Sequence, residues 1–234
     1  MEKNLWQRRI QRFIKRLRLK FLPQLCVNCK DIFTEDNTCF CKSCNEVLLF
    51  NNSMNKDTFP DVFLYAEELF IYAKYDICEK IITQYKFNGL SHPFIVFTTA
   101  FAKALAKEPW SKKIDYIVPV PLYRTVLRKR HFNQSDIVAD ILAKHLHSKT
   151  SKRNLQRKFY TTPQHNLTFK ERIHALKDVF YLKKHGEFDN CNILLIDDVL
   201  TSGTTTIECC KAIKQACKHT KIYIATLSSP AKII

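Results

Sequence analysis

The run that most constrains the fold of this chain is ILLIDDVLTSGTTT, residues 193–206. Four aliphatic residues lead into Asp197 and Asp198, a turn of small residues follows, and residues 207–216 have the pattern of a helix. A buried strand of a parallel sheet would carry the two acids to its carboxyl end, where open α/β sheets bind their ligands. The sequence therefore predicts a strand, a turn and a helix in that order, with a ligand site at the turn.

The composition of this turn favours a phosphate as the ligand. Its residues are Thr201, Ser202, Gly203, Thr204 and Thr205. Backbone N–H groups and hydroxyls at the start of a helix suit a phosphate, and glycine allows a positive φ or a close approach to the ligand. Asp197 and Asp198 would accept hydrogen bonds from sugar hydroxyls. We therefore expect a site for a ribose 5-phosphate group, whereas the lack of Walker A and G-x-G-x-x-G motifs argues against nucleoside triphosphates and dinucleotides.

The charge of the chain indicates polyanionic partners. The 234 residues suffice for one α/β domain and a small appendage, and they carry a net charge of +16. Such a field favours nucleic acid, phosphorylated metabolites or anionic lipid, although a solvated basic surface is the alternative. No stretch of about 18 uncharged apolar residues occurs, so we expect no transmembrane helix.

The cysteines predict a metal site near the N-terminus. Five of the ten fall within residues 26–44, and two C-x-x-C pairs are formed by Cys26 with Cys29 and Cys41 with Cys44. Two such pairs are a strong zinc signal, and four thiolates close a tetrahedral structural site. Cys39 is surplus to this set. Without a secretory signal, the remaining thiols favour a reducing, cytosolic compartment.

The first 60 residues divide into three predicted parts. Residues 1–25 contain a basic amphipathic helix over residues 4–22. Three roles stay open for it: docking on the rest of the chain while its basic face meets nucleic acid, lying on an anionic membrane, or acting as a transit peptide. Residues 26–50 form the four-cysteine module, and the polar residues 51–60 form a linker.

Residues 61–234 are expected to form an α/β domain. We predict strands at residues 63–65, 69–75, 116–121, 176–181, 193–199 and 222–227, and helices at residues 77–84, 94–107, 132–145 and 207–216. This alternation predicts a parallel sheet with helices on both faces.

Two further segments suit a phosphorylated ligand. Arg124, Arg128 and Arg130 belong to a basic segment directly after a predicted strand, and arginine binds phosphate oxygens through two parallel bonds. A solvated basic loop is the alternative. The polar residues 161–176, which contain Gln164 and Arg172, would form a loop that closes over a substrate or a plain surface loop.

The order of these motifs resembles the ComF (ComFC) late competence protein family. The resemblance covers about residues 26–228. Its motifs are the four cysteines, YKFNG at 85–89, VPVP at 118–121, FNQ at 132–134, TTPQ at 161–164 with ER at 171–172, and IDDVLTSGTT at 196–205. Three positions depart from the family pattern: His131 replaces a glycine, Val126 stands at the usual earlier arginine, and Ala175 stands at a common asparagine.

The resemblance implies a type I phosphoribosyltransferase-like fold with a zinc module. It implies binding of 5-phosphoribosyl 1-diphosphate (PRPP) with Mg²⁺, with Asp197 and Asp198 on the ribose and metal side and residues 201–205 on the 5′-phosphate. Arg124, Arg128 and Arg130 would lie on the diphosphate side. Gln164 and Arg172 would belong to the closing loop.

The resemblance also implies a role in natural transformation. Single-stranded DNA and other competence proteins, such as a DNA-uptake helicase, are then the expected partners, in the cytoplasm or at the membrane through the N-terminal helix. Tyr85, Phe87, Tyr123 and Phe132 lie near basic residues and are candidates for stacking on bases. The alternative is an active phosphoribosyltransferase of nucleotide metabolism with an unknown acceptor.

Overall fold

The computed structural model describes residues 24–33, 40–44, 58–88, 91–158 and 178–230. The predicted N-terminal helix, Cys39, most of the linker, Gln164 and Arg172 lie outside the described residues. Within the described ranges, no helix combines the length and the apolar character that spanning a membrane requires.

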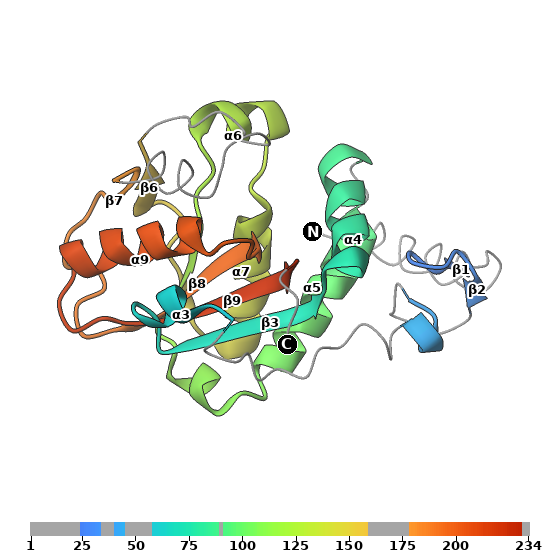
Figure 1. Cartoon of the computed structure of the whole chain (residues 1–234), viewed down its shortest axis with the longest axis horizontal. Helices are drawn as coiled ribbons and strands as arrows, with labels where there is room; N and C mark the ends of the chain where they lie inside the picture. Colours follow the sequence, from blue (N-terminus) through green and yellow to red (C-terminus); the bar gives the residue numbers. More distant parts are fainter. Residues whose placement is uncertain (1–23, 34–39, 45–57, 89–90, 159–177, 231–234) are drawn as a thin grey trace, which may run out of the picture.

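A parallel sheet forms the centre of the molecule, as the sequence predicts, and it has five strands, of which the short edge strand at residues 149–150 was not predicted (Figure 1). Its strands, in spatial order, are β3 (Glu68–Lys74), β9 (Lys221–Ser229), β8 (Asn192–Val199), β4 (Tyr116–Pro119) and β5 (Lys149–Thr150). The predicted ligand-bearing strand, β8, is the middle one, and its residues 193–196 are fully buried. A central parallel strand needs apolar residues on both faces, which explains the unbroken aliphatic run.

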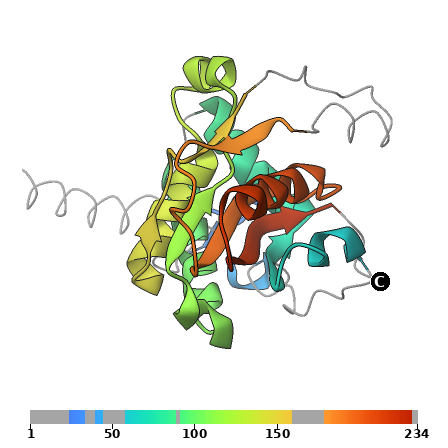
Figure 2. The same ribbon diagram turned by 90° about the vertical axis from the view of Figure 1, so that its left-hand side faces the viewer.

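Helices cover both faces of this sheet (Figures 1 and 2). One face carries α4 (Tyr75–Asn88), α5 (Ser91–Leu105) and α7 (Gln134–Leu146). The other carries α3 (Pro60–Phe63), α9 (Thr204–Ala216) and an antiparallel hairpin of β6 (Leu155–Arg157) and β7 (Phe180–Leu182). The 3₁₀ helix η1 (Pro109–Lys113) precedes β4. Two apolar layers therefore sandwich the sheet.

The N-terminal module packs against the face that carries α5. It contains a short antiparallel pair, β1 (Gln24–Leu25) and β2 (Ile32–Phe33). The ring of Phe40 packs edge-to-face on Phe97 of α5, with centroids 6.3 Å apart. Lys80 of α4 donates a hydrogen bond of 2.7 Å to the Asn28 side chain. A module this small buries little core of its own, so these contacts extend the core of the larger domain.

Three local predictions are corrected by the structure. Residues 63–65 are not a strand, because Pro60 starts the short helix α3, and Phe59 is buried beneath it rather than lying in a linker. Residues 124–130 form a helix, α6 (Arg124–Arg130), not a loop. The hairpin strand β6 was not predicted, and its partner β7 begins at Phe180 and lies outside the main sheet.

Candidate functional site

The two aspartates lie at the carboxyl end of the central strand. Asp197 and Asp198 are half-buried, and the Asp198 N–H donates to Asp197 Oδ1 at 2.9 Å. Backbone hydrogen bonds join β8 to both neighbouring strands at this point. The Val120 N–H donates to the Ile196 carbonyl at 2.8 Å, and the Leu200 N–H donates to the Ser228 carbonyl at 2.9 Å. These backbone bonds place both aspartates at the carboxyl end of the sheet, where open α/β sheets bind their ligands.

The turn after β8 places the start of α9 beside this edge. Gly203 has φ +77° and caps the helix, and the Ile207 N–H bonds to the Gly203 carbonyl at 2.8 Å. The first N–H groups of a helix have no partner within it. Ser202 Oγ and Thr204 Oγ1 lie 2.9 Å apart in the same turn. The turn therefore offers the N–H groups and hydroxyls that a phosphate needs.

Two constraints require glycine at position 203. A positive φ is strained for any other residue type here. A Cβ at this position would lie 2.7 Å from Val62 Cγ2, and Val62 is a buried residue of α3. The short helix α3, which the sequence analysis missed, therefore packs against the turn and holds its shape.

Two buried hydroxyls next to the site have no hydrogen-bond partner among the described residues. They are Thr206 Oγ1, in the first turn of α9, and Ser228 Oγ, on β9 beside Val199. Buried hydroxyls normally find partners, so these are polar atoms that a ligand or water can satisfy. The sequence around Ser228 does not indicate a ligand site, because only the pairing of β9 with β8 brings this residue next to the aspartates. A cavity of ≈ 200 Å³ between α3 and the turn borders Ser202 and Thr204.

The predicted diphosphate arginines lie on α6, which follows β4. Arg124 and Arg128 are one helical turn apart on the same face and are exposed, and neither side chain has an ion pair or hydrogen bond with another described residue. Figure 1 shows α6 standing off from the sheet on the two segments that leave β4 and enter α7. His131 ends α6 with φ +63°, so the family's glycine position is a left-handed one that this chain fills with histidine.

Asn133 of the FNQ motif joins α7 to the end of β4. Its side chain accepts from the Ser135 N–H at 3.3 Å, which caps α7, and donates to the Val120 carbonyl at 3.1 Å. It also donates to Asp136 at 2.9 Å. Burial raises the pKa of Asp136, against the lowering effects of Lys152 and Asn133. Asn133 therefore has a structural role, in which it caps α7 and bonds to the end of β4, and this role requires no ligand.

Tyr85 is not available to stack on a base, contrary to the sequence-based expectation. It is buried, and its ring stacks on Phe94 with centroids 4.4 Å apart and contacts Phe132 at 4.8 Å. The motif places this tyrosine on the inner side of α4, where it fills core. Burial also raises the pKa of its hydroxyl. Tyr123 and Phe132 are half-buried, and the side chain of Phe87 lies outside the described residues.

The four predicted cysteine ligands converge in space. The sulfur atoms of Cys26, Cys29, Cys41 and Cys44 all lie within 4.8 Å of one another. A tetrahedral zinc with bonds of about 2.3 Å would place its sulfurs about 3.8 Å apart, and the Cys29 and Cys41 sulfurs are 3.7 Å apart. The donor set and its spacing thus fit a closed, structural metal site.

Hydrogen bonds within the cluster favour the thiolate form of one cysteine, Cys26. Burial opposes ionisation of Cys26, but hydrogen bonds from the backbone at Cys29, Cys41 and Asn28 prevail and lower its pKa to about 6. Asn28 Nδ2 also lies 3.4 Å from the sulfur of Cys44, as a donor. A backbone hydrogen bond at Asp31 favours the thiolate of Cys29, but burial and the side chains of Asp31, Cys26 and Cys41 outweigh it and raise the pKa of Cys29. The pKa of Cys44 is raised as well, despite the hydrogen bond from Asn28. Metal ligation needs deprotonated sulfur, so a bound cation would have to displace protons from these two cysteines.

Curated relatives of this chain are competence and DNA utilization proteins. The chain is 33% identical over 102 residues to Competence protein F of Haemophilus influenzae and 26% identical over 145 residues to Competence protein ComFC of Bacillus subtilis. It is 34% identical over 94 residues to the DNA utilization protein YhgH of Escherichia coli. These matches cover 43%, 62% and 40% of this chain, and the chain spans only 44%, 57% and 40% of the relatives' own lengths. The resemblance to the ComF family is confirmed by these relatives, whereas no family model matches the chain.

Solved structures similar to this chain include phosphoribosyltransferases. A purine phosphoribosyltransferase from Pyrococcus horikoshii aligns with 59% of this chain and 75% of its own, at 21% identity and a TM-score of 0.38. An adenine phosphoribosyltransferase aligns with 64% of this chain and 75% of its own, at 16% identity and a TM-score of 0.39. The parallel sheet flanked by helices is established by its own strand order and by the helices packed on its two faces.

Proposed function

We propose that this chain is a competence-associated protein that binds PRPP, or a related ribose phosphate, with Mg²⁺ at the end of β8. The observation that carries the proposal is the pairing of Asp197 and Asp198 with the glycine turn at the start of α9. The turn would hold the 5′-phosphate through N–H groups, and the aspartates would orient the ribose hydroxyls. Carboxylate oxygens suit Mg²⁺, which would neutralise charge on the diphosphate.

We also propose that the chain binds single-stranded DNA and acts in DNA uptake during natural transformation. The names of the curated relatives and the net charge of +16 support this part of the proposal. Other competence proteins, such as a DNA-uptake helicase, are the expected partners, at the cytoplasmic face of the uptake machinery. In the four-cysteine module, a bound zinc would supply folding free energy.

Turnover is the second candidate function, in which the chain transfers the phosphoribosyl group to an unknown acceptor. Arg124 and Arg128 favour it, since they are exposed, have no ionic partner among the described residues and could stabilise a departing diphosphate. Release of diphosphate from PRPP, measured with a panel of purine and pyrimidine bases, tests this candidate. Release above the rate of an Arg124→Gln/Arg128→Gln variant would establish it.

Calorimetry with PRPP and Mg²⁺ tests the binding proposal directly. We expect the wild-type chain to bind and Asp197→Asn/Asp198→Asn to lose at least about tenfold in affinity, because each carboxylate accepts charge-assisted hydrogen bonds. Glu68→Gln, an exposed acid on the edge strand β3, is the matched control and should bind normally. Equal affinity of all three chains, or no binding by the wild type, would refute the proposal.

A further inference from the structure

A second cavity lies beside the edge strand β5, away from the site at β8. Its volume is ≈ 500 Å³, within the usual range of ligand pockets. β5 is two strands from β8, so the two sites are separated by about 10 Å across the sheet alone at a strand spacing of about 4.8 Å. The cavity shares no lining residue with the turn or with the two aspartates.

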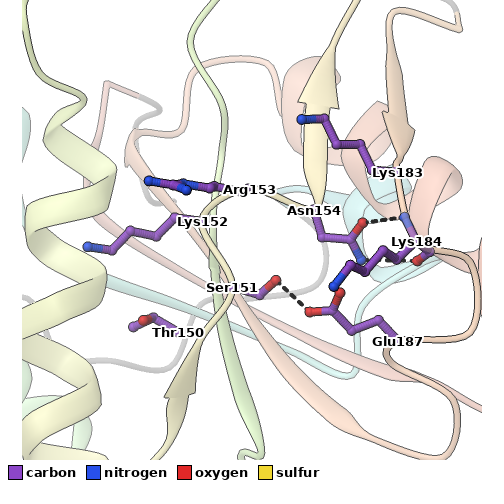
Figure 3. A pocket seen from close by; sticks show the side chains of 8 residues that line it. All are labelled: Thr150, Ser151, Lys152, Arg153, Asn154, Lys183, Lys184 and Glu187. Carbon is purple, nitrogen blue, oxygen red and sulfur yellow. Dashed lines mark hydrogen bonds between the residues drawn. The ribbon is translucent and has the colours of Figure 1, made fainter.

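Every side chain that lines this cavity is polar, and four of the eight are cationic. The lining residues are Thr150, Ser151, Lys152, Arg153, Asn154, Lys183, Lys184 and Glu187 (Figure 3). The one acid, Glu187, accepts a hydrogen bond of 2.9 Å from Ser151. Four cationic side chains around one cavity suit an anion, because arginine and lysine form charge-assisted hydrogen bonds with phosphate oxygens.

Three of the four cations have no ionic partner among the described residues. Lys152 pairs with Asp140 of α7, but Arg153, Lys183 and Lys184 make no ion pair or side-chain hydrogen bond there and are exposed. Figure 3 shows Lys183 and Lys184 extending toward the segment of residues 151–154, from which Arg153 and Lys152 leave on the side of α7. Uncompensated positive charge therefore lies on both sides of this segment.

The backbone under the lysines is held rigidly by Asn154. Its side chain donates to the Lys184 carbonyl at 3.1 Å and accepts from the Lys184 N–H at 2.7 Å, and the Lys183 N–H bonds to the Asn154 carbonyl at 3.0 Å. Asn154 is itself buried. The lysines thus project from a fixed base rather than from a free loop.

Basic and aromatic side chains continue beyond the cavity in both directions. Lys149 of β5 lies over the ring of Tyr116, 5.7 Å from its centroid, and Lys158 lies over Tyr181, 5.5 Å from its centroid. Both rings are partly exposed. A band of cations with aromatic rings beside it matches a nucleic acid strand, which needs backbone charge and surfaces for bases, better than one compact anion.

We propose that the cavity beside β5 binds the phosphate backbone of a single nucleic acid strand, separately from the ribose-phosphate site. Lys183, Lys184 and Arg153 contact successive phosphates, and Tyr116 and Tyr181 lie where bases can stack. This inference rests on the proposed binding of single-stranded DNA and assigns a place to it. The buried Tyr85, which sequence reasoning put forward for stacking, has no part in it.

The test compares two double variants of the full chain by fluorescence anisotropy with a labelled thymidine oligonucleotide. Lys183→Gln/Lys184→Gln removes two cations of the cavity, and Lys103→Gln/Lys107→Gln removes two exposed lysines at and just beyond the end of α5. We expect the first to bind at least about tenfold more weakly, with a slope of log affinity against log salt shallower by about 1.4. The second should bind as the wild type does, and both should bind PRPP normally.

The possible failures are distinguishable. If the wild-type chain binds no oligonucleotide, the DNA part of the proposed function falls together with this inference. If it binds and both variants match it, only the cavity assignment is overturned. Tripolyphosphate, titrated by calorimetry, is the probe for a small ligand: loss of its binding in Lys183→Gln/Lys184→Gln with unchanged oligonucleotide affinity would assign the cavity to a free polyphosphate and refute the strand.

Discussion

The turn after β8 and the cavity beside β5 both suit phosphate, but different parts of the chain form them. At the turn, the donors are backbone groups whose positions are set by Gly203, by the start of α9 and by the packing of α3. At the cavity, the charge sits on long lysine and arginine side chains. A backbone site fixes one phosphate in one orientation, whereas flexible cations attract phosphates with little orientation and are weakened by salt. The two proposals together therefore give one molecule a selective site at the turn and a tolerant site at the cavity.

Gly203→Ala should produce the largest effect and separate the two sites most clearly. A Cβ at this position would be strained by the positive φ and would lie 2.7 Å from Val62 Cγ2. We therefore expect a cost of at least about 2 kcal/mol, seen either as a lower free energy of unfolding or as a displacement of the turn. PRPP affinity should fall by at least about 30-fold, and oligonucleotide affinity should not change. Calorimetry and anisotropy on the same preparation measure both.

Gly186→Ala is the matched control for this substitution. Gly186 has φ +75°, but its Cβ would lie no closer than 3.3 Å to a neighbour, the Asp189 carboxylate. We expect backbone strain alone and normal PRPP affinity. If the Gly203 and Gly186 variants bind PRPP equally well, the turn is not the phosphate site.

Raising the salt concentration should also distinguish the two sites by their ligand affinities, with a smaller difference but without any substitution. With three phosphate contacts, oligonucleotide affinity should fall about 20-fold between 50 and 200 mM salt. PRPP affinity should fall by less than about threefold, because a site built from fixed, partly buried groups is screened less. Parallel titrations at several salt concentrations check this. Equal slopes of log affinity against log salt for the two ligands would contradict the proposed difference between the two sites.

Removal of metal from the four-cysteine module should have the smallest effect on either site. The described contacts of the module lie on the face of α4 and α5, away from both sites. We expect about one zinc per chain, released to a colour-forming chelator after thiol modification, and changes of less than about twofold in both affinities. Cys191→Ser, outside the cluster, should retain the metal, and Cys26→Ser should lose it. A large loss of oligonucleotide binding in the apo chain would place DNA on the module instead.

The sequence predicts the strand, turn and helix of the proposed selective site well, because their residues are contiguous. An aliphatic run, two acids and a glycine turn are visible within residues 193–206, and the structure places them on the central strand, a turn and a helix as expected. The four cysteines are equally easy to recognise in the sequence, because the two members of each pair are separated by two residues. The structure brings the two pairs together in space.

The tolerant site was not predictable, because its residues are distant in the sequence. Lys152 and Arg153 meet Lys183 and Lys184 only through the antiparallel pairing of β6 with β7, in which Leu155 opposes Leu182. The helix α3 was missed for a similar reason, since its four residues are too few for a periodic pattern and its packing on the turn is tertiary. Tyr85 shows the opposite error, because a motif aromatic near basic residues is buried as core.

Ribose phosphate and the nucleic acid strand are proposed to bind at two separate sites. The most direct measurement is oligonucleotide affinity, by anisotropy at constant ionic strength, with and without saturating PRPP and Mg²⁺. Two independent sites predict the same dissociation constant in both conditions, and PRPP titrated into the preformed complex should leave the oligonucleotide bound. Displacement of the oligonucleotide in proportion to bound PRPP would mean that one site serves both ligands and would contradict the account.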